Sequence, residues 1–131
     1  MYRAMMSYND NESIMGIREI YKDLFQYKVN GKISFENKKM ITFFQIEGRK
    51  IRINKQNGET EIFYASIEDL AEELKKDEFI RIHKSYLVNS MYVKQFSHNR
   101  IVLYDGTELS VSRKYSKKVR EFFIDRIKKI K

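Results

Sequence analysis

The chain has 131 residues, a formal net charge of +8 and 14% aromatic residues, and it contains no Cys, Pro or Trp. The length suits one domain with a core of ordinary size. The absence of Cys excludes disulfides and Cys-based metal sites and fits a reducing compartment. No stretch approaches the roughly 20 apolar residues of a membrane span, and the N-terminus lacks the apolar segment of a signal peptide. We therefore expect a soluble, cytoplasmic protein.

The positive charge is confined to one part of the chain. Residues 1–78 carry 13 Lys and Arg against 14 Asp and Glu, whereas residues 79–131 carry 13 Lys and Arg against four acidic residues. A one-sided basic field attracts nucleic acid or an anionic membrane surface. The alternative is charge that only keeps a small protein soluble.

The N-terminal part of the chain predicts a polar tail followed by a helix. Residues 1–11 are polar and are expected to be poorly ordered. Residues 12–24 have the apolar spacing of a helix, with one face formed by Ile14, Ile17, Tyr21 and Leu24. We expect residues 1–24 to be a linker or a dimer element that precedes one domain over residues 25–131.

Nine short strands are predicted in the middle of the chain. Asn-Gly at residues 30–31 and 57–58 and Asp-Gly at residues 105–106 each separate β-prone runs, which is the strongest local signal for a hairpin. The predicted strands cover residues 25–29, 32–36, 41–46, 50–55, 59–64, 79–83, 92–96, 100–104 and 107–112. This pattern predicts a mainly β (α+β) fold of stacked small antiparallel sheets.

Two further segments are predicted as helices. Ser66 to Asp69 resembles a capping box, and apolar residues follow it on one face, which indicates a short helix over residues 66–76. Residues 114–130 place an apolar stripe, which includes Ile127, opposite a strongly basic face. This last helix would therefore pack on the sheets through one side and expose its lysines on the other.

Residues 79–89, Phe-Ile-Arg-Ile-His-Lys-Ser-Tyr-Leu-Val-Asn, are the most informative stretch of the sequence. Cationic or hydrogen-bonding side chains interrupt an otherwise apolar, β-prone run at Arg81, His83, Lys84 and Ser85. All four types of side chain can bond phosphate oxygens. Because a strand that only filled a core would not carry so many donors, this segment indicates binding to a polyanion.

The same segment resembles the signature of the LytTR family of bacterial DNA-binding domains, in which the central strand reads approximately Phe-x-Arg-x-His-Arg/Lys-Ser-x-Leu-Val-Asn. Phe63-Tyr64 before the short helix and residues 109–113 before a basic segment are also similar to the family. The resemblance runs from about residue 25 to the early C-terminal helix. It implies an elongated stack of small antiparallel sheets and a transcriptional regulator that binds duplex DNA, commonly as two copies on paired direct repeats.

The resemblance also implies that three loops contact successive grooves of one DNA face. In the first loop, residues 47–50, either Arg49 or Lys50 would enter a major groove, and Lys50 lies nearer the matching position. Arg or Lys to guanine is the commonest specific contact there. In the second loop, Lys84 would cross a minor groove, and in the third loop Arg113 would read the other major groove. The alternative for these residues is an ordinary solvated surface cation.

Phosphate contacts are predicted around these base readers. The candidates are Arg81, His83, Ser85, Ser112, Lys114, Lys117 and Lys118. Three of them have a second interpretation, because His83 could be a satisfied structural group, Arg81 an internal ion-pair partner and Ser112 a cap of the last helix. Asn89 is expected to close a turn through its side chain rather than to contact DNA.

Other functional classes have weaker support. The sequence has no Gly-rich phosphate loop, no His-Glu-x-x-His and no Gly-x-Ser-x-Gly, so we expect no enzyme, no catalytic residue, no metal and no cofactor. Phe122 and Phe123 give the basic C-terminal helix the composition of an interfacial helix, so a membrane-surface or protein-partner module is the alternative function. The many aromatic residues leave RNA as a third possible ligand.

Members of the family commonly carry a receiver domain ahead of the DNA-binding part. About 24 residues precede the matching region, which is too few for a receiver. A stand-alone regulator and a piece of a longer regulator with an upstream receiver or sensor domain therefore both stay open. No membrane partner is expected.

Overall fold

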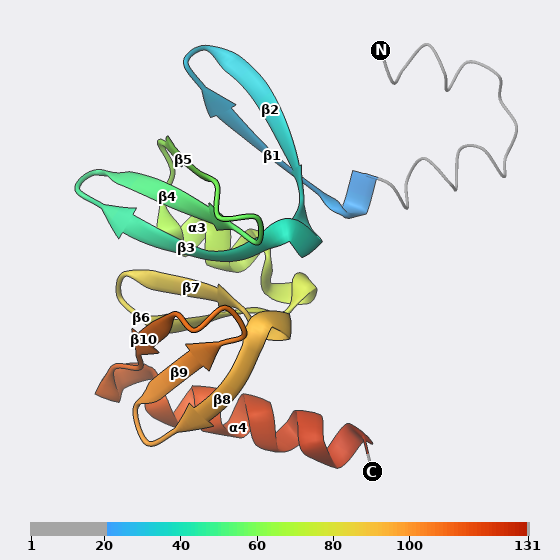
Figure 1. Ribbon diagram of the computed structural model, residues 1–131, viewed down its shortest axis with the longest axis vertical. Helices are drawn as coiled ribbons and strands as arrows, with labels where there is room; N and C mark the ends of the chain where they lie inside the picture. Colours follow the sequence, from blue (N-terminus) through green and yellow to red (C-terminus); the bar gives the residue numbers. More distant parts are fainter. Residues whose placement is uncertain (1–20, 131) are drawn as a thin grey trace, which may run out of the picture. The chain divides into compact units, whose positions relative to one another are not determined.

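The structure is a computed structural model that describes residues 21–130. This part of the chain divides into two compact units, residues 21–40 and residues 41–130, and each is described separately (Figure 1). The predicted helix over residues 12–24 lies almost entirely outside the described residues. Leu24 already belongs to the first strand, so the helix does not extend to it as predicted.

The first unit is a β-hairpin followed by a short 3-10 turn. Strand β1 (Leu24–Val29) pairs antiparallel with β2 (Lys32–Asn37), and η1 (Lys38–Met40) follows. Asn30 and Gly31 between the strands both have positive φ, 51° and 77°, which is the requirement of a type I′ turn. The Asn-Gly signal therefore predicted this hairpin correctly.

The second unit is built on a five-stranded antiparallel sheet. The spatial order of its strands is β5-β4-β3-β7-β6, so that β3 lies at the centre (Figure 1). The strands are β3 (Ile41–Glu47), β4 (Lys50–Lys55), β5 (Thr60–Phe63), β6 (Phe79–His83) and β7 (Tyr86–Asn89). Between β5 and β6 lie the helix α3 (Ile67–Glu73) and the 3-10 turn η2 (Lys75–Asp77).

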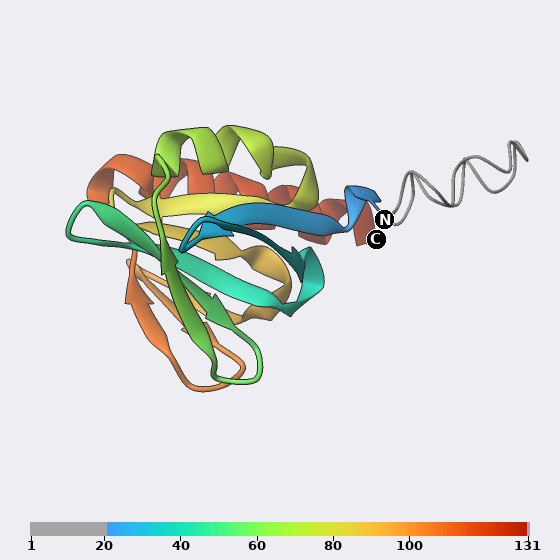
Figure 2. The same cartoon turned by 90° about the horizontal axis from the view of Figure 1, so that it is seen from above.

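Helix α3 covers one face of this sheet and begins at the predicted cap. The Ser66 hydroxyl accepts a hydrogen bond from the Asp69 N–H at 3.3 Å, which satisfies one of the free donors of the first turn. The helix contacts β3, β6 and β7, and Figure 2 shows it lying over the sheet. On the central strand, the Phe44 ring lies 6.3 Å from Phe63 and 5.8 Å from Phe79, so the sheet has an aromatic layer of its own.

A three-stranded sheet and the last helix pack together with the second unit's larger sheet. The strands, in the order β10-β9-β8, are β8 (Val93–Ser97), β9 (Arg100–Leu103) and β10 (Glu108–Ser110), and the helix is α4 (Arg113–Ile130). The 3-10 turn η3 (Ser90–Tyr92) connects β7 to β8.

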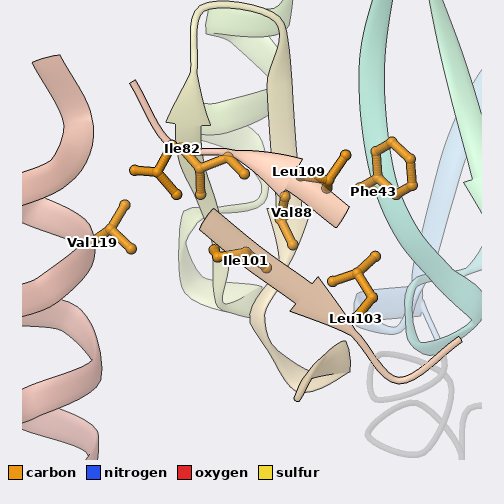
Figure 3. Packing of buried hydrophobic residues seen from close by; sticks show 8 residues of the cluster. Phe43, Ile82, Val88, Ile101, Leu103, Leu109 and Val119 are labelled. Carbon is orange, nitrogen blue, oxygen red and sulfur yellow. The ribbon is translucent and has the colours of Figure 1, made fainter. Parts of the chain in front are cut away.

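The shared core of these elements is entirely apolar (Figure 3). It consists of Phe43, Ile82, Val88, Ile101, Leu103, Leu109, Val111 and Val119. Phe43 and Val88 are paired across β3 and β7, and the next pair along the strands is Phe44 and Leu87. Successive side chains point to opposite faces of a sheet, so Phe43 and Val88 lie on the face away from the aromatic layer of Phe44. Burial of each large side chain stabilises the fold by about 1.5–3 kcal/mol, and this core fixes α4 against β6.

The predicted mainly β fold of small antiparallel sheets is confirmed, and all nine predicted strands are present. The strand predicted over residues 79–83 is β6, but the chain turns back at Lys84-Ser85 and residues 86–89 form a tenth strand, β7, which was not predicted. Ile127 was also misplaced, since it is 55% exposed and the partly buried Arg126 lies beside it. No helix within residues 21–130 combines the length and the apolarity that crossing a membrane requires.

Candidate nucleic-acid interface

Three connections meet at one edge of the second unit. They are the β3–β4 turn (residues 48–49), the β6–β7 turn (residues 84–85) and the start of α4 (residues 112–114), and together we call them the basic edge. All three lie on the left in both Figure 1 and Figure 2. Backbone hydrogen bonds link two of them to the strands beside the others: Ile46 N–H in β3 donates to the Ser85 carbonyl at 3.0 Å, and Ser112 N–H donates to the Ile82 carbonyl in β6 at 2.9 Å.

The β3–β4 turn presents two cations in different environments. Gly48 has a φ of 64°, which a side chain other than Asn or Asp rarely adopts, and the Glu47–Lys50 pair closes the two-residue turn. The Lys50 ammonium lies 4.8 Å from the centre of the exposed Tyr64 ring. The exposed Arg49 side chain makes no hydrogen bond or ion pair within the described part of the chain, so it is the freer of the two.

Side chains hold the β6–β7 turn in place. Arg81 donates from Nε to the His83 carbonyl at 3.2 Å and from Nη2 to the Lys84 carbonyl at 2.9 Å, and its guanidinium lies 5.3 Å from the centre of the Tyr115 ring. The Arg81 side chain is only 14% exposed. The turn is therefore tied to the first residues of α4 as well as to its own strand.

The His83 ring bonds to the turn through one nitrogen and leaves the other nitrogen without a partner in the described chain. The Ser85 N–H donates to His83 Nδ1 at 3.0 Å, so Nδ1 is unprotonated in this geometry and Nε2 carries the ring proton. The ring also lies 5.0 Å from Tyr86. The imidazole thus closes the turn through one nitrogen, while the other is a hydrogen-bond donor. The ammonium of Lys84, at the tip of the turn, is exposed.

The start of α4 adds Arg113, which is exposed and is the first residue of the helix. Lys114 lies beside it, with its ammonium 5.5 Å from the centre of the Tyr115 ring. Lys117 and Lys118 are exposed one turn further along. Ser112 precedes the helix, and its carbonyl accepts a hydrogen bond from the Tyr115 N–H at 3.0 Å.

An acidic side chain lies close to this edge. Glu68 in the first turn of α3 approaches Arg81, with 3.9 Å between its carboxylate and the guanidinium. A backbone hydrogen bond and the Ser66 hydroxyl hold the pKa of Glu68 below its usual value, and the charges of Arg81 and Lys114 lower it further. Glu68 therefore stays ionised and offsets part of the positive charge on Arg81.

Basic residues of the described chain differ in whether a carboxylate neutralises them. Ion pairs with a carboxylate include those of Arg52 with Glu47, Lys55 with Glu61, Arg81 with Glu68, Arg100 with Glu108 and Arg126 with Glu78. In contrast, the cationic groups of Arg49, Lys84 and Arg113 at the basic edge have no such partner among residues 21–130. Unpaired, exposed cations are the ones available to an external anion.

Asn89 behaves as the sequence predicted. Its side chain accepts a hydrogen bond from the Met91 N–H at 3.0 Å and donates one to the Ile41 carbonyl at 3.0 Å. These two bonds close the η3 turn and connect β7 to the start of β3. The residue is buried, as expected for an asparagine with a structural role.

A second group of polar residues at the start of α4 did not emerge from the sequence. His98 and Asn99, at the tip of the β8–β9 hairpin, line a surface hollow of about 320 Å³ together with Arg113, Ser116 and Arg120. The spacing of Arg113, Ser116 and Arg120 could have indicated a common helix face. The approach of the hairpin to that face could not be foreseen, because it depends on how α4 packs.

Comparison with known proteins gives a consistent result. A family model described as the LytTr DNA-binding domain matches residues 31–124. The chain is similar to the Sensory transduction protein LytT of Bacillus subtilis (strain 168), with 32% identity over 57 residues, which are 40% of this chain and 24% of that protein. The matched region is therefore about a quarter of that relative's length.

Among solved structures, the chain is similar to the LytTr DNA-binding domain of a protein from Bacillus cereus designated a methyl-accepting/DNA response regulator. The TM-score is 0.66 at 21% sequence identity, and the match covers 77% of this chain and 96% of that one. At this identity the likeness shows a common fold.

Proposed function

The chain belongs to the LytTr DNA-binding domain family, and from this premise we propose that it regulates transcription by sequence-specific binding to duplex DNA through the basic edge. The single observation that carries this proposal is the grouping of Arg49, Lys84 and Arg113. They come from three separate connections of one unit, and none is neutralised by a carboxylate within residues 21–130.

The roles of the three cations follow from their chemistry and placement. Arg113 and either Arg49 or Lys50 would read bases in two major grooves, where a bidentate Arg–guanine contact discriminates by ~1–3 kcal/mol. Lys84, at the tip of the central turn, would enter the minor groove between them. The guanidinium of Arg49 is unpaired whereas Lys50 lies against Tyr64, which favours Arg49 as the reader in the first turn.

Phosphate contacts would fix the register of the domain on DNA. We assign them to the free Nε2–H of His83 and to Ser85, Ser112, Lys114, Lys117 and Lys118. Arg81 is a weaker candidate, because its guanidinium already donates to two carbonyl groups of the β6–β7 turn. We propose that Arg81 positions Lys84 and His83 instead.

The proposal extends to the assembly on DNA. Two copies would bind paired direct repeats, each through its own basic edge. The relative from Bacillus subtilis is a longer sensory transduction protein, which is compatible with an additional receiver or sensor domain in the protein that contains this chain.

The proposal is tested by selecting bound duplexes from a random-sequence library and measuring their affinity at several salt concentrations. We expect the selection to converge on a motif, and each neutralised phosphate to contribute about −0.9 to the slope of log K against log salt. Equal affinity for all sequences would overturn specific binding. Preferential binding to anionic lipid vesicles in physiological salt would favour the membrane-surface alternative.

A further inference from the structure

The hollow at the start of α4 is lined only by side chains that can donate hydrogen bonds. They are His98 and Asn99 from the β8–β9 turn and Arg113, Ser116 and Arg120 from α4. None of these five side chains makes a hydrogen bond or an ion pair with another residue in the part of the chain that the structure describes. Unpaired donors around one hollow of about 320 Å³ suit a ligand that only accepts hydrogen bonds.

The helix contributes a continuous stripe to this hollow. Arg113, Ser116 and Arg120 are three and four residues apart, so they lie one above the other on the same face of α4. Val119, which anchors the helix in the core, faces a different direction. The position of the stripe is therefore fixed by the packing of Val119 rather than by the hollow itself.

The hairpin brings its residues to the stripe through regular backbone contacts. Ser97 pairs with Arg100 and closes the two-residue turn His98-Asn99, and the Asn99 carbonyl accepts a hydrogen bond from the Val111 N–H at 2.7 Å. This bond holds the turn beside the segment that leads into α4. The hairpin tip and the start of the helix consequently form one surface.

His98 adopts a backbone conformation that is uncommon for any residue other than Gly. Its φ is 54°, in the left-handed region, where Asn, Asp and His are the side chains found most often. A histidine that adopts this conformation at an exposed turn contributes no apolar contact to the core. Binding of a ligand by the His98 side chain would explain why a histidine occupies this turn.

From these observations we propose that the hollow binds a DNA backbone phosphate next to the base pair that Arg113 reads. The proposal rests on the proposed function and deepens it, because it adds a fourth connection, the β8–β9 turn, to the DNA-contacting surface. Arg120 supplies the charge, and His98, Asn99 and Ser116 supply neutral donors. The contact is with the phosphate alone, so it strengthens binding to every sequence and sets the register in which Arg113 meets the bases.

The test compares Arg120→Ala and His98→Gly with the control Lys128→Ala, which removes an exposed cation about 12 Å further along the same helix. Each variant is titrated with a selected duplex and a random duplex at several salt concentrations. We expect Arg120→Ala to weaken binding to both duplexes by about fivefold to tenfold, as for one lost hydrogen bond, and to reduce the salt slope by about 0.9. His98→Gly should weaken binding while its melting temperature is unchanged or higher, because Gly relieves the left-handed backbone.

Duplexes that carry one neutral methylphosphonate at successive positions locate the contact. The wild-type chain should lose affinity when a phosphate beside the base pair of Arg113 is neutral, and Arg120→Ala should be insensitive at that same phosphate. If Arg120→Ala behaves like Lys128→Ala, or if it remains sensitive at every phosphate, the hollow is not a phosphate site. Absence of any sequence preference in the wild-type chain would instead overturn the proposed function itself.

Discussion

Arg81 Nη2 donates a hydrogen bond of 2.9 Å to the carbonyl oxygen of Lys84, the residue at the tip of the β6–β7 turn. The turn contains no glycine, and its backbone is held by this bond, by a second bond from Arg81 to the His83 carbonyl, and by the Ser85 N–H to His83 Nδ1. The guanidinium of Arg81 lies 5.3 Å from the centre of the Tyr115 ring, which joins the turn to α4. One partly buried guanidinium thus orders two of the three parts of the basic edge.

We predict that Arg81→Lys fails to restore what Arg81→Ala loses. A lysine keeps the charge but cannot donate from two nitrogens in a fork to the His83 and Lys84 carbonyls. Both variants should lower the free energy of unfolding by about 1 kcal/mol, because the two carbonyl groups lose their donor and the turn loses its support. Both should also reduce DNA affinity, measured by titration alongside thermal unfolding. Near-complete rescue of affinity by lysine would indicate a phosphate contact instead.

Base readers and phosphate neighbours should separate in their mutational effects. Arg113→Ala and Arg49→Ala are expected to lower the ratio of specific to non-specific affinity, whereas Lys117→Ala should weaken binding to all sequences alike and reduce the salt slope. Comparison of Arg49→Ala with Lys50→Ala decides which residue of the first turn reads bases. The measurement is the affinity for a selected and a random duplex at equal salt.

If Arg113→Ala leaves the ratio of specific to non-specific affinity unchanged, the start of α4 does not read bases. If Arg49→Ala and Lys50→Ala both have small effects on that ratio, the β3–β4 turn does not read bases. Lys128→Ala is the appropriate control, since it removes one exposed charge near the far end of the same helix.

The sequence predicted most of the fold because its signals are local. Asn30-Gly31 supplies the two left-handed residues of a type I′ turn, and Ser66 caps α3 as expected. Strand β7 escaped prediction because no Gly, Asn or Asp marks the β6–β7 turn, which the side chains of Arg81 and His83 close instead. Residues 86–89 therefore carry no local sign that they form a strand of their own.

The hollow at the start of α4 was not predicted because its residues are far apart in the sequence and come together only in the folded chain. His98 and Arg120 are separated by two strands, the turn between them and two turns of helix, and they meet only because α4 packs against β6. The basic stripe of α4 could be predicted from its spacing. Ile127, in contrast, fits the apolar period but is exposed, and its neighbour Arg126 faces the domain instead and donates to Ser90.

The core that orients α4 should respond strongly to the loss of single methyl groups. Ile101 is fully buried in the cluster that holds Val119, so Ile101→Val should lower the free energy of unfolding by about 0.5–1.5 kcal/mol. The control Ile127→Val removes the same group from an exposed position and should change stability by less than about 0.5 kcal/mol. Urea unfolding measures both. Equal effects would mean that the helix end is covered in solution.

His83 should contribute to the turn and to DNA binding through different nitrogens. His83→Asn keeps an acceptor near the position of Nδ1 for the Ser85 N–H, but it removes the Nε2–H donor. We therefore expect His83→Asn to retain most of the stability and to lose DNA affinity. His83→Ala should lose affinity as well, and about 1 kcal/mol of unfolding free energy in addition, because the Ser85 N–H loses its partner.

Thermal unfolding and DNA titration of the two variants at one pH separate these contributions. If His83→Asn binds DNA as tightly as the wild-type chain, Nε2 contacts no phosphate and the role of His83 is limited to closing the turn. If His83→Asn and His83→Ala are equally destabilised, the asparagine does not replace Nδ1. The DNA affinity of each variant is then compared with that of the wild-type chain at the same folded fraction, which isolates the contribution of the imidazole. A loss of affinity that both variants share at matched folded fraction is the result expected for a phosphate contact through Nε2.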